Sequence, residues 1–385
     1  MTASPRTGKP SPALHRAPQA ARYAANRRAK TAANAAVAEE RSKTALVLGG
    51  GAPNSALMAG ALAAFEERGV RFDVVSTSGA GALVGLLWLA PKDASPAEAL
   101  RNWVNAYVDD TIYNLLPVNY KVFFKPGALA ERYRAWLNGL PGMQQILDES
   151  RVDGWGRLWR DWAQLVFATL SPSSLNWFDV GLCARVPFVE SIIDFSRIKS
   201  IPPYFYVNAY NLTNRTIDDF PKEVITPDHF RAAFAFPFIY GPFPLAGSEY
   251  YEGATRDPLN FKDLTERHKG LETIVVFDVL GTDALIRKPR NIYDSWVLSI
   301  SVPLVKTAED NLELFALKHN GGWRRCEGAK ADILVVPFDV SERDLSEVLD
   351  WSNSNGQRLF EIGHRSAQAF LDDEGAVLLN APVSR

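Results

Sequence analysis

Cysteine is scarce in this chain of 385 residues, which contains only Cys183 and Cys326. Two thiols outside any C-x-x-C pair cannot build a disulfide framework or a four-cysteine zinc site, so stability must come from packing. Long apolar runs are also missing: the best one, residues 81–90, has half the length that crosses a bilayer. The first 40 residues contain no apolar stretch typical of a secretory signal. These absences predict a cytoplasmic protein without a structural metal ion.

Apolar and aromatic residues, in contrast, are plentiful. They include 21 Phe, 12 Tyr and 10 Trp, and the hydrophobic fraction is 47%. This composition excludes a disordered, collagenous or low-complexity protein. The length fits one large domain or two ordinary ones.

Basic residues are concentrated at the N-terminus. Residues 1–43 hold nine Lys and Arg against Glu39 and Glu40, although the whole chain has a net charge of −2. We interpret this segment as a disordered basic tail. The alternatives are a helix that forms on an anionic membrane or polymer surface, and an organellar presequence. Peripheral contact with a lipid surface is therefore an expected partner interaction, and no specific nucleic-acid binding is predicted.

Strand, glycine-rich turn and helix follow one another twice after the tail. Residues 44–48 form an apolar strand before three glycines and a helix from 55 to 68, and residues 72–76 form a second strand before a helix from 81 to 89. This order is typical of parallel strands joined by crossover helices, so the predicted fold class is α/β. We assign residues 44–280 to this domain, residues 281–375 to its completion, and residues 376–385 to a C-terminal tail.

Residues 95–200 interrupt this pattern with helical segments and six of the ten Trp, which predicts a helical, aromatic-rich insertion. Trp155, Trp159 and Trp162 fall on one helical face. Such a stripe is typical of a buried core. It would also suit an acyl-binding groove or a lipid interface, because Trp tolerates one wet and one apolar side.

Three segments carry candidate chemistry. Gly49, Gly50 and Gly51 lie between a strand and a helix, where backbone amides could bind an anion or a developing oxyanion. Residues 73–85 form a strand, a sharp turn and a helix, the setting of a nucleophile elbow. Glu252 follows a predicted strand and precedes a glycine, where a carboxylate could activate a hydroxyl.

These segments, in this order, resemble the patatin-like phospholipases. The resemblance runs from about residue 44 to 280, and residues 232–242 are similar to the family's A-x-x-A-x-P segment. It implies a parallel sheet between helices and a Ser–Asp dyad that needs no histidine, metal or organic cofactor. It also implies a lipid or another acyl ester as the substrate.

All three signature elements depart from the family pattern. The family's G-T-S-A-G aligns with residues 77–81, so Thr77 and Gly81 belong to the nucleophile elbow and Gly79 takes the position of the nucleophile. Glu252 replaces the aspartate, and Asn54 replaces a basic residue of the oxyanion loop.

Two hypotheses account for these departures. In the first, Ser78 attacks the ester carbonyl one position early, Glu252 takes its proton, and the glycine loop stabilises the oxyanion. In the second, the protein is a catalytically inactive pseudoenzyme that binds lipid. The first is favoured, because the longer Glu252 side chain could follow a displaced hydroxyl.

Other interpretations remain open. A dinucleotide site would need a third glycine at the position of Asn54. A Ser–His–acid triad would have to use His364. Glu252 could also have a purely structural role, as an ion-pair partner of Arg256.

Overall fold

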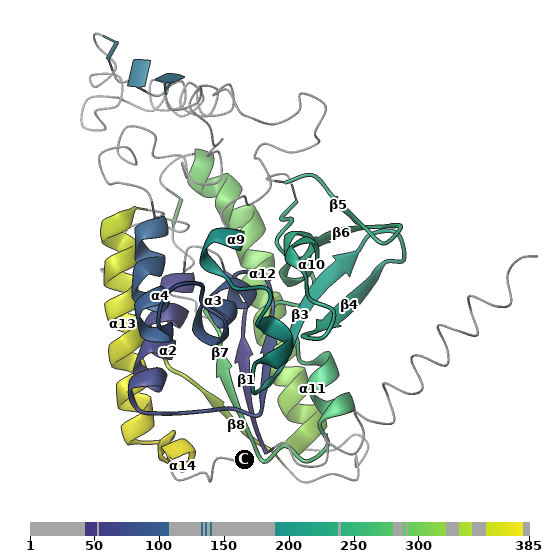
Figure 1. Cartoon of the computed structure of the whole chain (residues 1–385), viewed down its shortest axis with the longest axis vertical. Coiled ribbons are helices and arrows are strands. Elements are labelled where there is room, and N and C mark those ends of the chain that lie inside the picture. The colour runs from purple at the N-terminus through teal and green to yellow at the C-terminus, as the bar shows by residue number, and fades with distance from the viewer. Residues whose placement is uncertain are drawn as a thin grey trace, which may run out of the picture. The chain divides into compact units, whose positions relative to one another are not determined.

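The computed structural model of this chain has a central β-sheet, in which residues 44–48 form an inner strand (Figure 1). The structure describes residues 43–51, 54–107, 132–133, 135–136, 139–140, 189–237, 240–279, 288–289, 292–320, 331–340 and 352–379. Most of the predicted basic tail therefore lies outside the described residues, as do Trp155, Trp159, Trp162 and the helix expected at 156–170. The described residues belong to one compact unit.

Eight strands form a single sheet in this part of the chain. Their order is β5-β6-β3-β2-β1-β7-β8, with β4 paired to β3. The strands are β1 (Thr44–Leu48), β2 (Val74–Thr77), β3 (Tyr204–Asn211), β4 (Thr216–Pro221), β5 (Phe243–Leu245), β6 (Ser248–Glu252), β7 (Thr273–Phe277) and β8 (Asp332–Val335).

The central strands are parallel, as the sequence predicts. β3, β2, β1, β7 and β8 run in the same direction, and β1 and β7 are almost wholly buried. Because both faces of such a sheet are covered, β1 and β7 consist almost entirely of apolar residues. The expectation of a parallel sheet is incomplete, however, since β4, β5 and β6 pair antiparallel at the β3 side. The short turn between β3 and β4 permits that hairpin, whereas a parallel pair needs a long crossover.

Helices cover both faces of the sheet. The helical elements are α2 (Ser55–Glu67), α3 (Ala80–Leu89), α4 (Pro96–Asn102), α9 (Val189–Ile192), α10 (Pro227–Ala233), α11 (Lys262–Arg267), α12 (Ile292–Asn320), α13 (Asn353–Asp372) and α14 (Ala376–Leu379), with 3-10 turns η1 (Trp103–Ala106), η3 (Ile198–Ser200) and η4 (Gly253–Thr255). Figure 1 shows α2 beside α13, with α12 on the other side of the sheet.

The alternation of side chains along β1 separates the two layers. Leu46 and Leu48 belong to the larger apolar cluster, which includes residues of α2, α3 and α13. Ala45 and Val47 belong to a second cluster, which includes residues of α11 and α12. The predicted α/β class, a sheet between helices, is therefore confirmed.

Of the predicted insertion, the structure describes the two borders and a few residues between 132 and 140. The helix expected at 97–108 begins instead at Pro96, after Ser95 accepts the amide of Glu98, and becomes the 3-10 turn η1. Within the described ranges, no helix combines the length and hydropathy needed to cross a membrane. The helix α14 falls in the segment predicted as a C-terminal tail.

Candidate active site

Two strands that approach from opposite directions end beside the middle of β3. β2 pairs in parallel with Tyr204–Val207, and β6 pairs antiparallel with Ala209–Asn211. β4 pairs with both of these stretches of β3 and so occupies the other edge. Since a strand has two edges, β2 and β6 lie end to end along the same one. Their carboxyl ends, Thr77 and Glu252, therefore converge at Asn208.

Gly79 forms a sharp turn between β2 and α3. Its φ of 47° and ψ of −122° lie where side chains are strained, and it is the N-cap of α3. This strand–turn–helix is the geometry of a nucleophile elbow. The amide of Ser78 donates to the carbonyl of Leu48 at 3.0 Å, which ties the turn to β1. Gly81 is required because a Cβ there would collide with the same carbonyl oxygen.

The Glu252 carboxyl lies directly over the elbow. A Cβ added to Gly79 would collide with Oε1 of Glu252, and it would lie 3.0 Å from Cδ of Glu252 and 3.1 Å from Cβ of Ala254. The acid therefore fills the space that a nucleophile side chain at position 79 would need. The predicted acid and the predicted elbow do meet, but the glycine is the residue that Glu252 contacts.

Burial changes the acidity of Glu252. The residue is 8% exposed, and desolvation raises its pKa to about 8. Among the described residues, no ion pair or side-chain hydrogen bond reaches its carboxyl oxygens. Arg256, the predicted structural ion-pair partner, instead lies over the ring of Tyr210, with its guanidinium carbon 5.2 Å from the centroid. Near neutral pH most of the Glu252 population is a neutral acid.

Ser78 points to Asn208 rather than to Glu252. Its side chain is fully buried, and Oγ lies within donating distance of Oδ1 of Asn208 (2.8 Å) and of the Asp257 carbonyl (2.9 Å). Asn208 in turn donates to the same carbonyl at 2.9 Å. Asn208 also packs against Gly253, where a Cβ would collide with its side chain. These contacts link the elbow, β3 and the segment after β6.

Most of the other residues predicted for the elbow and the glycine loop donate hydrogen bonds to backbone carbonyls of the protein. Thr77 Oγ1 donates to the Tyr206 carbonyl at 2.7 Å. The amide of Gly49 donates to the Phe277 carbonyl (3.2 Å) and that of Gly50 to the Pro258 carbonyl (2.9 Å). Gly51, with φ of 131°, has no backbone acceptor among the described residues. Of the three predicted oxyanion amides, Gly51 alone keeps a free donor within the described ranges.

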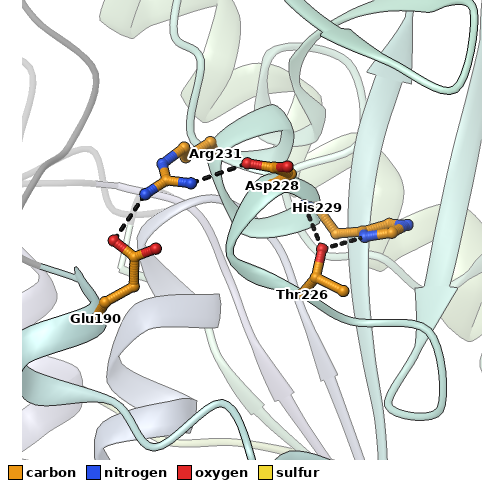
Figure 2. Close-up of polar contacts among 5 residues, drawn as sticks. All are labelled: Glu190, Thr226, Asp228, His229 and Arg231. Carbon is orange, nitrogen blue, oxygen red and sulfur yellow. Dashed lines mark hydrogen bonds and ion pairs between the residues drawn. The ribbon is translucent and has the colours of Figure 1, made fainter.

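The segment that follows the helix α10 holds the backbone of Glu252. The amide of Glu252 donates to the carbonyl of Ala235, just after α10, at 2.9 Å. Figure 2 shows the contacts that hold α10 in place. Thr226 caps the helix by accepting the amide of His229, and Arg231 forms ion pairs with Asp228 (2.8 Å) and with Glu190 of α9 (2.7 Å). Burial lowers the pKa of His229, which keeps the imidazole neutral near pH 7.

Sequence reasoning missed Asn208 and the Arg231 ion pairs. Asn208 could have been found, because it is the one polar residue within the apolar stretch 204–209 of β3. The pair with Asp228 has the i, i+3 spacing of a helix and could have been found, whereas the pair with Glu190 offers no such signal, since Glu190 is 41 residues away. His364, weighed for a triad, contacts Glu67 at 2.9 Å on the α2–α13 side. No group of three metal-ligating side chains occurs in the described ranges.

An α/β sheet with a glycine loop, an elbow and a facing carboxyl is the arrangement that the resemblance to patatin-like phospholipases implies. The family model for patatin-like phospholipase matches residues 46–265, and the chain belongs to this family. No curated protein matches the chain.

The solved structures that are similar have low sequence identity. VipD from Legionella pneumophila is 13% identical, with 86% of this chain and 67% of that chain covered and a TM-score of 0.36. Human GIVD cytosolic phospholipase A2 is 10% identical, with 94% and 64% covered and a TM-score of 0.42. The chain thus spans about two thirds of the length of these structures.

Proposed function

We propose that this protein binds a lipid acyl ester, or the fatty acid derived from it, at the elbow, and that no serine acyl-enzyme forms there. The observation that carries the proposal is that the Glu252 carboxyl fills the space that a side chain would need at Gly79, the position that the sequence comparison above aligns with the family's nucleophile. Family membership supports the lipid as the ligand class. A mostly neutral carboxyl suits this ligand, since it can donate a hydrogen bond to an ester or carboxyl oxygen.

A Ser78–Glu252 dyad is the alternative proposal. Its support is that a hydroxyl lies one residue before the elbow and a carboxyl lies over it. It requires Ser78 Oγ to leave both Asn208 and the Asp257 carbonyl and to become accessible from full burial. Breaking one such buried hydrogen bond costs about 1–3 kcal/mol. The geometry therefore favours lipid binding without serine chemistry.

Active-site labelling distinguishes the two proposals. We expect a fluorophosphonate probe to leave the wild-type protein unlabelled, as judged by mass spectrometry of the peptide that contains Ser78. In the double variant Gly79→Ser/Glu252→Asp, the shorter acid leaves room for the new side chain and restores the family's Ser–Asp pair. We expect that variant to be labelled at position 79, even though the positive φ costs about 1–3 kcal/mol.

Binding is measured on the same preparations with a fluorescent fatty acid. We expect saturable binding by wild type and by Ser78→Ala. Labelling of wild type at Ser78 that disappears in Ser78→Ala would establish the dyad instead. The absence of any fatty-acid or phospholipid binding would refute the proposed ligand class.

A further inference from the structure

We propose that the Glu252 carboxylate acts as a general base on a water molecule at the elbow, so that this site hydrolyses a bound acyl ester directly, without an acyl-enzyme. The inference rests on the proposed binding of a lipid acyl ester. It differs from the dyad in the nucleophile, which is water rather than Ser78.

The first support is the placement of the carboxyl. β6 ends at Glu252 and β2 ends at the elbow, and both are registered against the same edge of β3. This register brings Oε1 of Glu252 to the point from which a side chain at Gly79 would extend. A base at the position of Oε1 lies next to the position that the attacking oxygen would occupy at an elbow of this kind. Geometry of this kind is the first requirement of a general base.

The second support is that no side chain of the described residues binds the carboxyl. Glu252 is more than nine-tenths buried, and within the described ranges no side chain binds its oxygens. Gly79 lies against the carboxyl and has no side chain that titrates. The acids nearest in the sequence are Glu249, which is exposed on β6, and Asp257, which accepts the amide of Asn260 at 3.0 Å. A buried acid held without a partner costs stability, and such groups are concentrated where chemistry occurs.

The third support is electrostatic. A carboxylate whose pKa is about 8 is a much stronger base than an ordinary glutamate, and it titrates close to neutral pH, where general bases are most effective. Gly79 caps the ten-residue helix α3, whose N-terminal amides carry a partial positive charge. The amide of Gly51, which has no acceptor among the described residues, adds a donor that could receive the oxyanion.

The reaction balances with water as the co-reactant. The Glu252 carboxylate takes one proton from water while the water oxygen bonds to the ester carbonyl carbon. The carbonyl electrons move to its oxygen and form a tetrahedral oxyanion. Collapse of this intermediate breaks the carbon–oxygen bond to the alcohol, which receives the proton from Glu252. The products are a fatty acid and an alcohol, and the carboxylate is restored.

The test compares two carboxylate-to-amide variants of one strand in the full chain. Glu252→Gln removes the base and keeps its size, and Glu249→Gln is the matched control, because Glu249 is exposed on the same strand β6. With p-nitrophenyl butyrate and longer esters, we expect kcat/KM to fall at least 100-fold in Glu252→Gln and less than twofold in Glu249→Gln. Thermal melting verifies that both variants are folded.

Two further readouts identify the nucleophile. We expect wild-type kcat/KM to rise with pH and to level off above about 8, because only the ionised carboxylate accepts a proton. We also expect no initial burst of p-nitrophenol and no methyl ester when methanol is added, since both require an acyl-enzyme.

Several outcomes would overturn the inference. They are activity retained in Glu252→Gln, a burst with formation of methyl ester, and a wild type that binds the fluorescent fatty acid yet hydrolyses none of the esters. In the last case the proposed lipid binding stands and only the hydrolysis fails. If wild type neither binds the fatty acid nor hydrolyses an ester, both proposals fail.

Discussion

The Glu252 carboxyl fills the space that a side chain at position 79 would need. A serine at position 79 would collide with the glutamate, whereas an aspartate at position 252 would be one methylene shorter and would leave more room. Together the two residues fit without a clash. The two side-chain sizes are therefore complementary.

The stability of the protein is expected to depend on the ionisation of Glu252. Its pKa is about 8 in the folded chain against an ordinary value of 4.5, so between these values the folded state binds more protons than the unfolded state. Folding stability from this group is complete below pH 4.5 and is lost as the pH rises through 8. One pKa unit corresponds to about 1.4 kcal/mol.

Glu252→Gln should remove this dependence. We expect the variant to be more stable than wild type at pH 8, by a few kcal/mol, and nearly equal to it at pH 4.5. Urea unfolding at both pH values measures the difference, with Glu249→Gln as the control for a loss of charge. Parallel stability profiles of wild type and Glu252→Gln would show that the folded-state pKa is not raised.

At the scale of elements, α2 and α13 are packed so closely that their backbones touch. A Cβ on Gly60 would collide with the carbonyl oxygen of Phe360, and a Cβ on Gly363 would collide with that of Leu57. Both obstacles are backbone atoms, which cannot rotate away as a side chain can. This close contact holds α13, at the end of the chain, against the helix that follows the glycine loop.

Gly60→Ala should destabilise the protein. The added methyl group forces α2 and α13 apart, and overpacking of this kind costs about 1–3 kcal/mol. The exposed helix residue Gln357 provides the control, since Gln357→Ala should change stability by less than about 0.5 kcal/mol. Urea unfolding at pH 5, where Glu252 is neutral in the folded state, measures both. Equal stability of Gly60→Ala and wild type would refute this packing.

At the scale of the whole molecule, charge is divided unevenly along the chain. The first 43 residues carry nine basic residues and two acidic ones, whereas the full chain has a net charge of −2. The remainder is therefore acidic. A basic segment near an anionic lipid surface gains about 1 kcal/mol for each Lys or Arg, and salt screens this attraction.

The N-terminal segment is expected to direct the protein to anionic lipid. We expect sedimentation with vesicles that contain phosphatidylserine, none with phosphatidylcholine alone, and a decline as salt is raised from low to high concentration. Replacing four tail residues with glutamine should weaken binding at least tenfold: Arg22, Arg27, Arg28 and Lys30. The same change at four exposed domain positions is the control: Arg197, Lys199, Arg215 and Lys269. Equal effects of the two sets would contradict a role for this segment.

Local sequence was sufficient for much of the fold. Residues 44–48 form a strand because they are apolar and lead into glycines, and Pro227 begins a helix that Thr226 caps. These features depend on neighbours in the chain. The presence of an elbow at residues 77–81 and of a carboxyl after a strand at Glu252 also followed from short motifs.

Only the tertiary structure decided what the site residues contact. The direction of the Ser78 side chain depends on its hydrogen bond to Asn208, which is 130 positions away. The amide of Gly50 donates to the carbonyl of Pro258, which is also far away in the sequence. The position and acidity of Glu252 depend on two strands that share one edge of β3. Local backbone preferences predict elements, but burial and hydrogen bonding between distant segments arise from packing. The sequence therefore determined which chemical groups surround the elbow, and the fold determined which of them face it.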